Sequence, residues 1–306
     1  MIESFQQILP HGTTLSCRAA GERGRPVLLF LHGFPEAAFV WDGLLAHFAQ
    51  AGNGGYRCVA PNLRGYEQSS APEDVAAYRA KPLVQDLTAL IDVITQDSPT
   101  PGQLACLVAH DWGGALAWSV AAQCPAAMRR LAIVNAPHPA TFQRELANSP
   151  TQQASSAYMN FLARPDAPAL LAENDFARLW PFFTNMAADS GPLAWLDDAT
   201  RDRYRAVWRQ GLHGPCAYYA ASPLRPPTAN DAGAAAVKLP RERVSVNVPT
   251  LVVWGLGDTA LPEALLDGLD DFVPDLCIER VPGATHWIVH EQPQRVAALI
   301  GDFLTS

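Results

Sequence analysis

The chain has 306 residues, of which 49% are hydrophobic and 17% are charged, and its formal net charge at pH 7 is −8. This length allows a substantial buried core, and the acidic balance argues against a nucleic acid partner, because phosphate binding needs a basic patch. No apolar run reaches the roughly 20 residues that a membrane helix needs, so no membrane partner is expected.

The amino-terminal stretch MIESFQQILPHGTT carries an early acid and lacks the basic start and apolar block of a signal peptide. A cytoplasmic location is therefore expected. The six cysteines are scattered, with no paired spacing of the kind found in disulfide frameworks or metal sites. The sequence thus predicts neither a metal nor another cofactor.

Short apolar runs separated by helix-length intervals recur along the chain. These runs predict strands of a mostly parallel sheet covered by helices on both faces, that is, an α/β fold. The expected strands lie within residues 27–33, 56–63, 104–110, 131–137, 250–255 and 276–281. Apolar residues at helical spacing predict helices over 84–95 and 292–304.

The segment between the fourth and fifth of these strands has a different character. It is rich in proline and aromatic residues and shows no strand-like run, which predicts a helical insertion. We assign residues 1–137 to the first part of the core, 138–243 to a helical cap, and 244–306 to the second part of the core. The proline- and alanine-rich stretch 222–240 is expected to be the loop that leads back to the core.

Asp111 follows the expected strand 104–110 directly and precedes a helical pattern. The run Ala109-His110-Asp111-Trp112-Gly113 has the small-x-nucleophile-x-small form of a nucleophile elbow, in which a tight turn lifts one side chain above the sheet. The alternative is that Asp111 caps the helix by accepting a hydrogen bond from a backbone N–H group.

Two further strand ends favour the catalytic interpretation. Asp258 follows the strand 250–255 and His286 follows the last strand, which gives the order nucleophile, acid, histidine that is typical of α/β-hydrolases. In addition, Phe34 follows the first of the expected strands. Its backbone N–H could pair with that of Trp112 to form an oxyanion hole.

Aspartate in the nucleophile position predicts chemistry at saturated carbon. A carboxylate is ionised at neutral pH and can displace a leaving group without a base, which leaves an ester on Asp111. His286 would deprotonate a water molecule that hydrolyses this ester, and Asp258 would orient the imidazole and stabilise its charged form. The oxyanion hole would stabilise the charge that develops on the Asp111 carbonyl oxygen in this second step.

These motifs resemble those of the α/β-hydrolase fold epoxide hydrolases, with the related haloalkane and haloacetate dehalogenases close behind. The resemblance covers essentially the whole chain and is strongest in HGFPE, PNLRGYEQSS, HDWGG and GATHW. It implies an α/β-hydrolase fold with an inserted helical cap. Glu67 in RGYEQSS stands where the family usually has glycine, a departure that touches no catalytic role.

The resemblance also implies two tyrosines in the cap that bind the epoxide oxygen and donate a proton as the ring opens. YMNFLARPD carries this role onto Tyr158, and HGPCAYYAAS carries it onto Tyr219, with Tyr218 as the alternative if the helix register differs. The alternative for each tyrosine is a purely structural role, in which its ring packs against other side chains.

The dehalogenases remain the closest alternative. Where haloalkane dehalogenases have a halide-binding amide this chain has Phe34, and where haloacetate dehalogenases have two arginines it has Trp112 and Ala115. A non-catalytic ligand-binding protein of the same fold is a further alternative. The cap aromatics suggest a small, largely apolar epoxide as substrate, with water as co-substrate. The sequence leaves open whether the chain forms a homodimer.

Other histidines have structural interpretations. We expect His32 to be part of the oxyanion loop and His110 to face the core or a backbone network. His286 and His290 lie four residues apart, but the flanking prolines and glycine predict a loop feeding a helix, so a metal pair is not expected.

Overall fold

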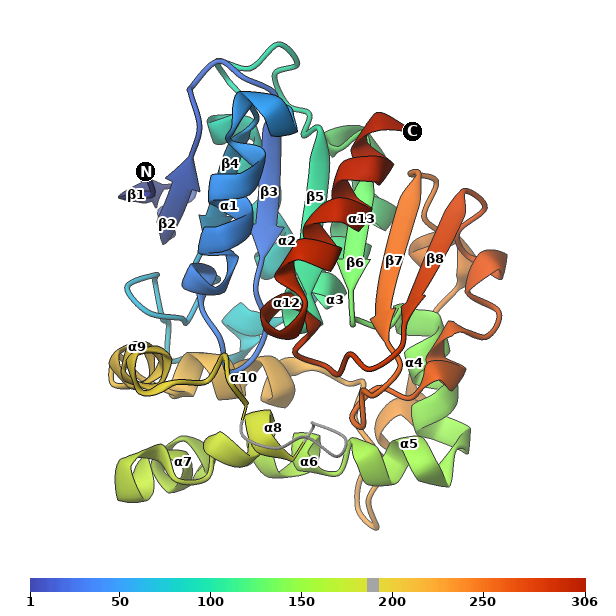
Figure 1. The fold of residues 1–306 in the computed structure, drawn as a ribbon. Coiled ribbons are helices and arrows are strands. Elements are labelled where there is room, and N and C mark those ends of the chain that lie inside the picture. The colour runs from blue at the N-terminus through green and yellow to red at the C-terminus, as the bar shows by residue number, and fades with distance from the viewer. Residues whose placement is uncertain (186–192) are drawn as a thin grey trace.

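The computed structural model describes residues 1–185 and 193–306. Within these residues, eight strands form one sheet in the order β1-β2-β4-β3-β5-β6-β7-β8 (Figure 1). The pairs β1/β2 and β2/β4 are antiparallel, and every other neighbouring pair is parallel. The strands are β1 (Glu3–Ile8), β2 (Thr14–Ala20), β3 (Val27–Leu31), β4 (Arg57–Pro61), β5 (Cys106–His110), β6 (Leu131–Val134), β7 (Thr250–Gly255) and β8 (Leu276–Val281).

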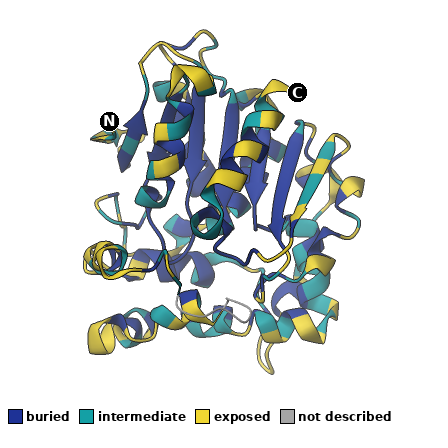
Figure 2. Cartoon of the chain, viewed as in Figure 1, coloured by how far each residue is buried: buried dark blue, intermediate teal, exposed yellow. Residues whose placement is uncertain are grey.

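The apolar runs of the sequence form the parallel part of this sheet. All residues of β3, β4, β5, β6 and β7 are buried, as expected for strands covered on both faces (Figure 2). The predicted mostly parallel α/β sheet is therefore confirmed. The first two strands were not predicted, because β1 is largely exposed and lacks an apolar run.

Helices cover both faces of the sheet, with α1, α12 and α13 on one face and α2 and α3 on the other (Figure 1). The predicted helices over 84–95 and 292–304 correspond to α2 and α13. The α-helices are α1 (Asp42–Phe48), α2 (Ala80–Ile94), α3 (Asp111–Gln123), α4 (Pro139–Asn148), α5 (Pro150–Ser155), α6 (Tyr158–Leu162), α7 (Ala167–Phe176), α8 (Trp180–Thr184), α9 (Asp198–Trp208), α10 (His213–Ala221), α11 (Arg241–Val244), α12 (Ile288–Glu291) and α13 (Pro293–Thr305).

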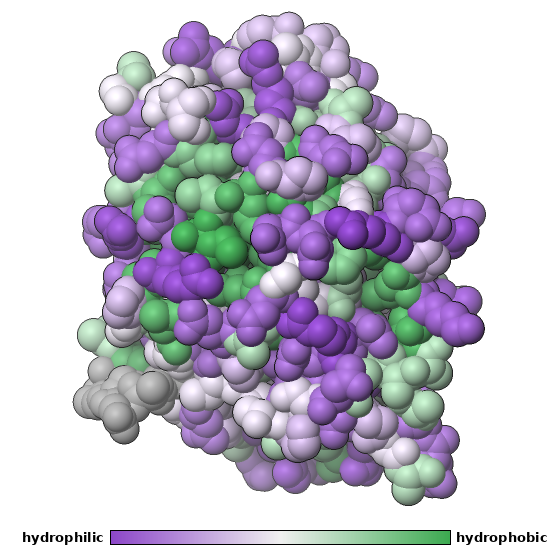
Figure 3. Space-filling view, turned by 90° about the vertical axis from the view of Figure 1, so that its right-hand side faces the viewer, coloured by the Kyte–Doolittle hydropathy of each residue, from purple (hydrophilic) through white to green (hydrophobic). Residues whose placement is uncertain are grey.

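Short 3-10 helices complete the described secondary structure: η1 (Ala38–Trp41), η2 (Ala51–Asn53), η3 (Val75–Tyr78), η4 (Pro125–Ala127), η5 (Gly233–Ala236), η6 (Glu263–Leu266) and η7 (Leu269–Asp271). In the described residues, no helix is long and apolar enough to cross a membrane. On the face in Figure 3, hydrophilic side chains surround a limited hydrophobic area, which is ordinary for a protein surface.

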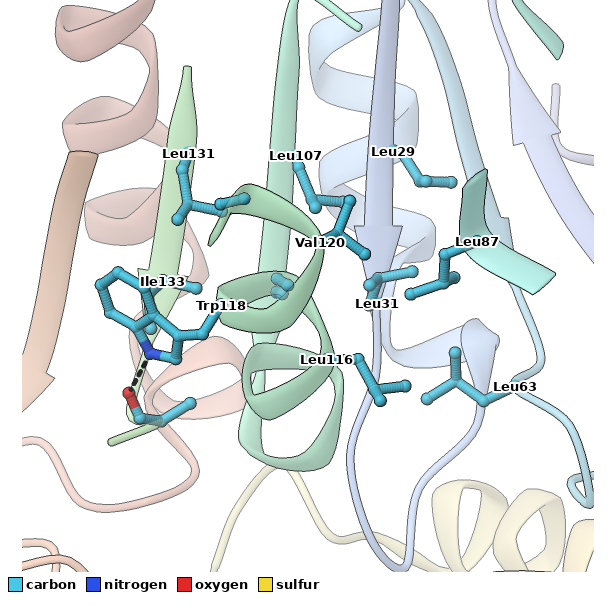
Figure 4. Packing of buried hydrophobic residues seen from close by; sticks show 14 of the residues in the cluster. Leu29, Leu31, Leu63, Leu87, Leu107, Leu116, Trp118, Val120, Leu131 and Ile133 are labelled. Carbon is cyan, nitrogen blue, oxygen red and sulfur yellow. Dashed lines mark hydrogen bonds between the residues drawn. The ribbon is translucent and has the colours of Figure 1, made fainter. Parts of the chain in front are cut away.

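Two apolar clusters hold the helices to the sheet, one on each face. In the cluster beneath α3, Leu116 and Val120 pack toward leucines of β3 and β5 (Figure 4). Trp118 is buried in the same cluster, and its indole Nε1–H donates a hydrogen bond to the carbonyl oxygen of Ala136 at 3.2 Å. This contact joins the middle of α3 to the loop after β6.

The segment between β6 and β7 contributes helices α4 to α11, and α6 to α10 lie across the carboxyl ends of the parallel strands (Figure 1). We call this segment the helical insertion. A third cluster, rich in aromatic side chains, packs the helical insertion against the loops after β3 and β8. The assignment of 138–243 as a separate cap domain stays a prediction, although the helices lie where a cap would cover the strand ends.

Candidate active site

Asp111 is the first residue of α3 and adopts a left-handed backbone conformation, with φ of +48°. A non-glycine residue in this region costs of order 1 kcal/mol, and such strain is common at functional turns. The turn needs glycine at position 113, because a Cβ atom there would lie 2.5 Å from the carbonyl oxygen of Leu31. The sequence around Asp111 therefore forms a sharp strand-to-helix turn.

The Asp111 carboxylate does not cap its own helix. The capping position is His110, with no side-chain hydrogen bond to the helix. Instead, the Oδ1 atom of Asp111 accepts a hydrogen bond of 2.7 Å from the backbone N–H of Phe34, in the loop after β3. Among the described residues, no other backbone N–H donates to this carboxylate. Of the two predicted oxyanion-hole donors, Phe34 therefore contacts Asp111 and Trp112 does not.

The other predicted catalytic side chains lie beside Asp111. His286 comes from the loop after β8, and its Nε2 atom is 3.8 Å from the Oδ2 atom of Asp111. Its Nδ1 atom is 2.7 Å from the Oδ2 atom of Asp258, in the loop after β7. Because Asp258 binds Nδ1, the Nε2 atom of the same ring is the one that faces Asp111.

Asp258 is held by a further set of hydrogen bonds. The backbone N–H groups of Ala260 and Leu261 each donate to its Oδ1 atom at 2.9 Å, and the Nδ2 group of Asn135 donates to its Oδ2 atom at 2.7 Å. The amide oxygen of Asn135 in turn accepts a hydrogen bond from the backbone N–H of Gly255. These bonds fix both oxygens of the buried carboxylate.

Asn135 was not predicted as a site residue. It directly follows β6 and, like Asp111, has a positive φ, of +40°. A polar residue immediately after a buried apolar strand was a signal in the sequence, because the same position relative to β5 is that of Asp111. Sequence reasoning passed over it because an amide has no catalytic role of its own in the expected chemistry.

Three carboxylates determine the charge of His286. Burial alone would lower the pKa of His286, but Asp258, Asp111 and Glu36 outweigh burial and raise this pKa to about 9. His286 is therefore protonated at neutral pH in the free protein, as an imidazolium between two aspartates.

Glu36 is a second residue that sequence reasoning missed. It is fully buried, and its carboxylate contacts Nδ1 of His110 at 3.2 Å, Nε2 of His290 at 2.6 Å and the hydroxyl of Tyr204 at 2.9 Å. The opposing effect of burial is outweighed by the two histidines, so the pKa of Glu36 lies well below its usual value. The Nε2 atom of His110 is 2.9 Å from the backbone oxygen of His286. The carboxylate thus connects a helix of the insertion, through His110, to the loop of His286.

His32 lies in the loop after β3, as expected. His32 is fully buried, its Nδ1 atom is 3.0 Å from the carbonyl oxygen of Gly33, and its Nε2 atom accepts a hydrogen bond from the backbone N–H of Leu63. Burial lowers the pKa of His32 to about 4, so it is neutral. In the described residues, no group of three or more His, Cys, Asp or Glu side chains is arranged as a metal site.

The tyrosines of the helical insertion have distinct environments. The hydroxyl of Tyr218 donates to the carbonyl oxygen of Arg64 at 2.9 Å, so it is engaged with the core. Tyr219, the next residue of α10, packs against Trp112 and Phe34, with ring centroids 5.1 and 5.2 Å away. Tyr158, at the start of α6, lies 6.1 Å from Tyr219, measured between ring centroids. Tyr158 and Tyr219 are therefore the pair that the structure brings together.

Both of these phenols are held in the neutral form. Burial, with the negative charge of Asp111, raises the pKa of Tyr158 and that of Tyr219 well above the usual value. Asp258 adds to the effect on Tyr158. The two hydroxyls therefore carry protons at neutral pH and can act as hydrogen-bond donors.

Comparisons with known proteins agree with this arrangement of strands and helices. The family described as alpha/beta hydrolase fold matches residues 26–293. The chain is 33% identical to the AB hydrolase superfamily protein YfhM of Bacillus subtilis, over 98% of this chain and 97% of that protein. It is 31% identical to epoxide hydrolase 4 of Mus musculus, over 98% of this chain and 79% of that protein.

A solved structure is similar over the same extent. The crystal structure of the Bacillus megaterium epoxide hydrolase in complex with an inhibitor has a TM-score of 0.86 and 26% sequence identity. The similarity covers 99% of this chain and all of that one. It therefore includes the helical insertion as well as the sheet.

Proposed function

This chain belongs to the α/β-hydrolase fold family, and we propose that it is an epoxide hydrolase, which converts an epoxide and water into a vicinal diol. Full-length similarity to proteins named epoxide hydrolase supports this function. The observation that carries it is the pair of neutral phenols, Tyr158 and Tyr219, near the charge of Asp111. Two such donors suit an alkoxide leaving group, which needs a proton, whereas a halide does not.

The first step is the attack of Asp111 on an epoxide carbon. The Oδ2 atom is the suitable nucleophile, because Oδ1 is bonded to the backbone N–H of Phe34. A C–O bond forms between Oδ2 and the carbon while the bond from that carbon to the epoxide oxygen breaks. The departing oxygen takes a proton from Tyr158 or Tyr219, which leaves a hydroxyalkyl ester and one tyrosinate.

The second step is hydrolysis of the ester by water. The Nε2 atom of His286 removes a proton from the water, whose oxygen bonds to the Cγ atom of Asp111. The N–H of Phe34 stabilises the oxyanion that forms at Oδ1, and the N–H of Trp112 is proposed as the second donor. Collapse of the intermediate releases the diol, which takes the proton from His286. The proton that the new carboxyl group loses passes to His286 and restores the imidazolium, because the proton that the ring carried at the start has replaced the one given up by the tyrosine.

The charge of His286 supports this order of steps. An imidazolium with a pKa of about 9 cannot act as a base at neutral pH, and its positive charge lies beside Asp111, the attacking nucleophile. Formation of the ester removes the negative charge of Asp111. One of the causes that raise the pKa of His286 is then gone, so the ring can give its proton to the tyrosinate and then serve as the base.

The test is a single turnover in water labelled with heavy oxygen. The label should enter the carboxylate of Asp111, and the first diol released should be unlabelled. The variant His286→Gln should accumulate the ester, seen as added mass on the peptide that contains Asp111. His47→Gln, a change on α1 outside the site, is the matched control and should show normal turnover.

Three outcomes would contradict the proposal. Label that appears directly in the first diol would exclude the ester route. Halide release from a haloalkane, without diol formation from epoxides, would support the dehalogenase alternative. Stabilisation by an epoxide in a thermal shift assay, without any diol, would support a ligand-binding protein.

A further inference from the structure

Gln152 is a buried residue of the helical insertion whose amide contacts the loop of Asp258. It belongs to α5, which lies beyond the carboxyl end of β7 (Figure 1), and it is only 2% exposed. The Nε2 group donates a hydrogen bond of 3.0 Å to the carbonyl oxygen of Ala260 and another of 2.9 Å to the hydroxyl of Ser156. The amide therefore joins a segment of the insertion to a loop of the core.

The bond to Ala260 leads directly to the predicted acid. Ala260 lies two residues after Asp258, and its backbone N–H donates to the Oδ1 atom of that carboxylate at 2.9 Å. Its carbonyl oxygen accepts the bond from Gln152. One buried residue of the loop is thus bonded to the acid through its N–H and to the insertion through its carbonyl group.

The bond to Ser156 leads to the predicted proton donor. Ser156 is buried at the junction of α5 and α6, and its hydroxyl oxygen accepts the bond from Gln152. The carbonyl oxygen of Ser156 accepts a bond of 3.0 Å from the backbone N–H of Met159, in the first turn of α6. Tyr158 is the first residue of that helix. A short chain of hydrogen bonds therefore connects the start of α6 to the loop of Asp258.

Stability alone does not account for an amide at this position. A carbonyl oxygen can only accept hydrogen bonds, so the Nε2 group of Gln152 must face Ala260, and Oε1 is on the other side of the amide. Among the described residues, Oε1 is buried and accepts no hydrogen bond. A buried polar atom without a partner lowers stability by about 1–3 kcal/mol. An apolar side chain of the same size would avoid this loss, which indicates that the two donated bonds have another role.

We propose that Gln152 is a positioning residue, which holds the hydroxyl of Tyr158 in place relative to the carboxylates of Asp111 and Asp258. The inference rests on the proposed function, in which Tyr158 donates a proton to the epoxide oxygen. Both carboxylates contribute to the raised pKa of Tyr158, as expected for a hydroxyl held near them. A displacement of about 1 Å at a reacting group can lower a rate by about 100-fold, so a bond that fixes the donor affects the chemical step.

The test is a double-mutant cycle on the formation of the ester. The variant His286→Gln traps the ester, so its formation can be followed in single turnovers as added mass on the peptide that contains Asp111. In this background, Gln152→Met, Tyr158→Phe and their combination are compared, with cyclohexene oxide and propylene oxide as substrates. Methionine has nearly the size and shape of glutamine but lacks the amide.

The neighbouring residue provides a matched control, Gln153→Met. Gln153 lies on the same helix, and its Nε2 group donates to the carbonyl oxygens of Leu146 at 2.9 Å and Ala147 at 3.4 Å. Both acceptors belong to α4, within the insertion. The amide of Gln153 therefore makes the same kind of bond as that of Gln152 without contacting the core.

We expect Gln152→Met to slow ester formation about tenfold when Tyr158 is present and less than about twofold in Tyr158→Phe, because no hydroxyl is then left to position. Gln153→Met should change the rate less than about twofold in both cases. Circular dichroism and Tm verify folding. Ser156→Ala removes a single hydroxyl from the same chain of bonds. It replaces Gln152→Met in the cycle if that variant does not fold, with the same dependence on Tyr158 expected.

An unchanged rate in a folded Gln152 variant would overturn the inference. Slowing of equal size with and without the hydroxyl of Tyr158 would also overturn it, because a merely structural role has that effect. In either case, diol formation from one of the two epoxides by the natural protein would leave the proposed function intact. Failure to form ester or diol from both epoxides would instead contradict the proposed function itself, so the two failures are distinguishable.

Discussion

Replacing Asp111 with asparagine should lower the pKa of His286. The substitution keeps the size and shape of the side chain but removes its negative charge, as ester formation would. The Nε2 atom of His286 is 3.8 Å from the Oδ2 atom of Asp111, and the charge of this carboxylate is one of three that raise the pKa of the ring to about 9. The variant therefore isolates the effect of one charge on the base.

Coulomb's law sets the size of the effect. At this separation two unit charges interact by roughly 1 kcal/mol in water and roughly 4 kcal/mol at an effective dielectric constant of about 20. These energies correspond to about 1 to 3 pKa units. The side chain of Asp111 is 16% exposed, and Asp258 is the larger cause of the raised pKa, so we expect the lower part of this range. The pKa of His286 should fall by at least about one unit.

The assay is a pH titration followed by NMR on protein labelled in its eight histidines. The variant His286→Gln assigns the signal by its loss. Asp166→Asn is the control, because Asp166 is exposed and paired with Arg164, and it should leave the titration unchanged. A pKa of His286 that stays near 9 in Asp111→Asn would refute the view that ester formation releases the base.

Three further predictions concern the surroundings of the site. Tyr158→Phe and Tyr219→Phe should each lower kcat/KM for an epoxide about 100-fold by removing a proton donor, while an ester already formed on the enzyme should still hydrolyse in rapid-quench experiments. Glu36→Gln should reduce the free energy of unfolding by about 3 kcal/mol at pH 7 in urea titrations. The pKa of Glu36 is depressed in the folded state, so its stabilising effect is present above about pH 4.5 and declines as the pH falls below that. The difference in free energy of unfolding between the variant and the natural protein should therefore be smaller at pH 3 than at pH 7. Gly214→Ala should lower Tm by several degrees in calorimetry, because its Cβ atom would lie 2.4 Å from the Cα atom of Gly65; an unchanged Tm would contradict the close contact.

The inner strands of the parallel sheet, β3 to β7, were predictable from the sequence because they are buried on both faces. Such strands are continuous apolar runs, and the boundaries of β7 and β8 were predicted without error. The edge strand β1 lacked this signal because it is largely exposed, and β2 (TLSCRAA) is mostly buried but has no continuous apolar run. The resemblance to epoxide hydrolases, drawn from short motifs, is confirmed by similarity over the whole chain.

The side chains of the site were predictable to different degrees. Asp111, Asp258 and His286 stand at strand ends, where a polar residue after an apolar run is conspicuous. The choice between Tyr218 and Tyr219 was not predictable, because adjacent residues of a helix point about 100° apart and the orientation of α10 depends on its packing. The catalytic roles of all these side chains stay predictions.

Glu36 could not have been identified as a buried charge from its own surroundings in the sequence. A carboxylate is stable in a core only if cationic or hydrogen-bonding partners surround it. Here the partners are His110, His290 and Tyr204, which come from three distant parts of the chain. Local sequence patterns contain no information about contacts between residues so far apart in the chain.

The order of the sheet also constrains how this protein acquires its activity. The site is built from the loops after β3, β5, β7 and β8, which carry Phe34, Asp111, Asp258 and His286. The loops of Phe34 and His286 therefore bring together segments that lie near opposite ends of the chain. Closing loops of this length is slow and requires the intervening strands to be in register. A partly folded chain, even one with most of its helices formed, would have no complete site. Recovery of turnover during refolding is therefore a measure of assembly of the entire parallel sheet, rather than of any single region.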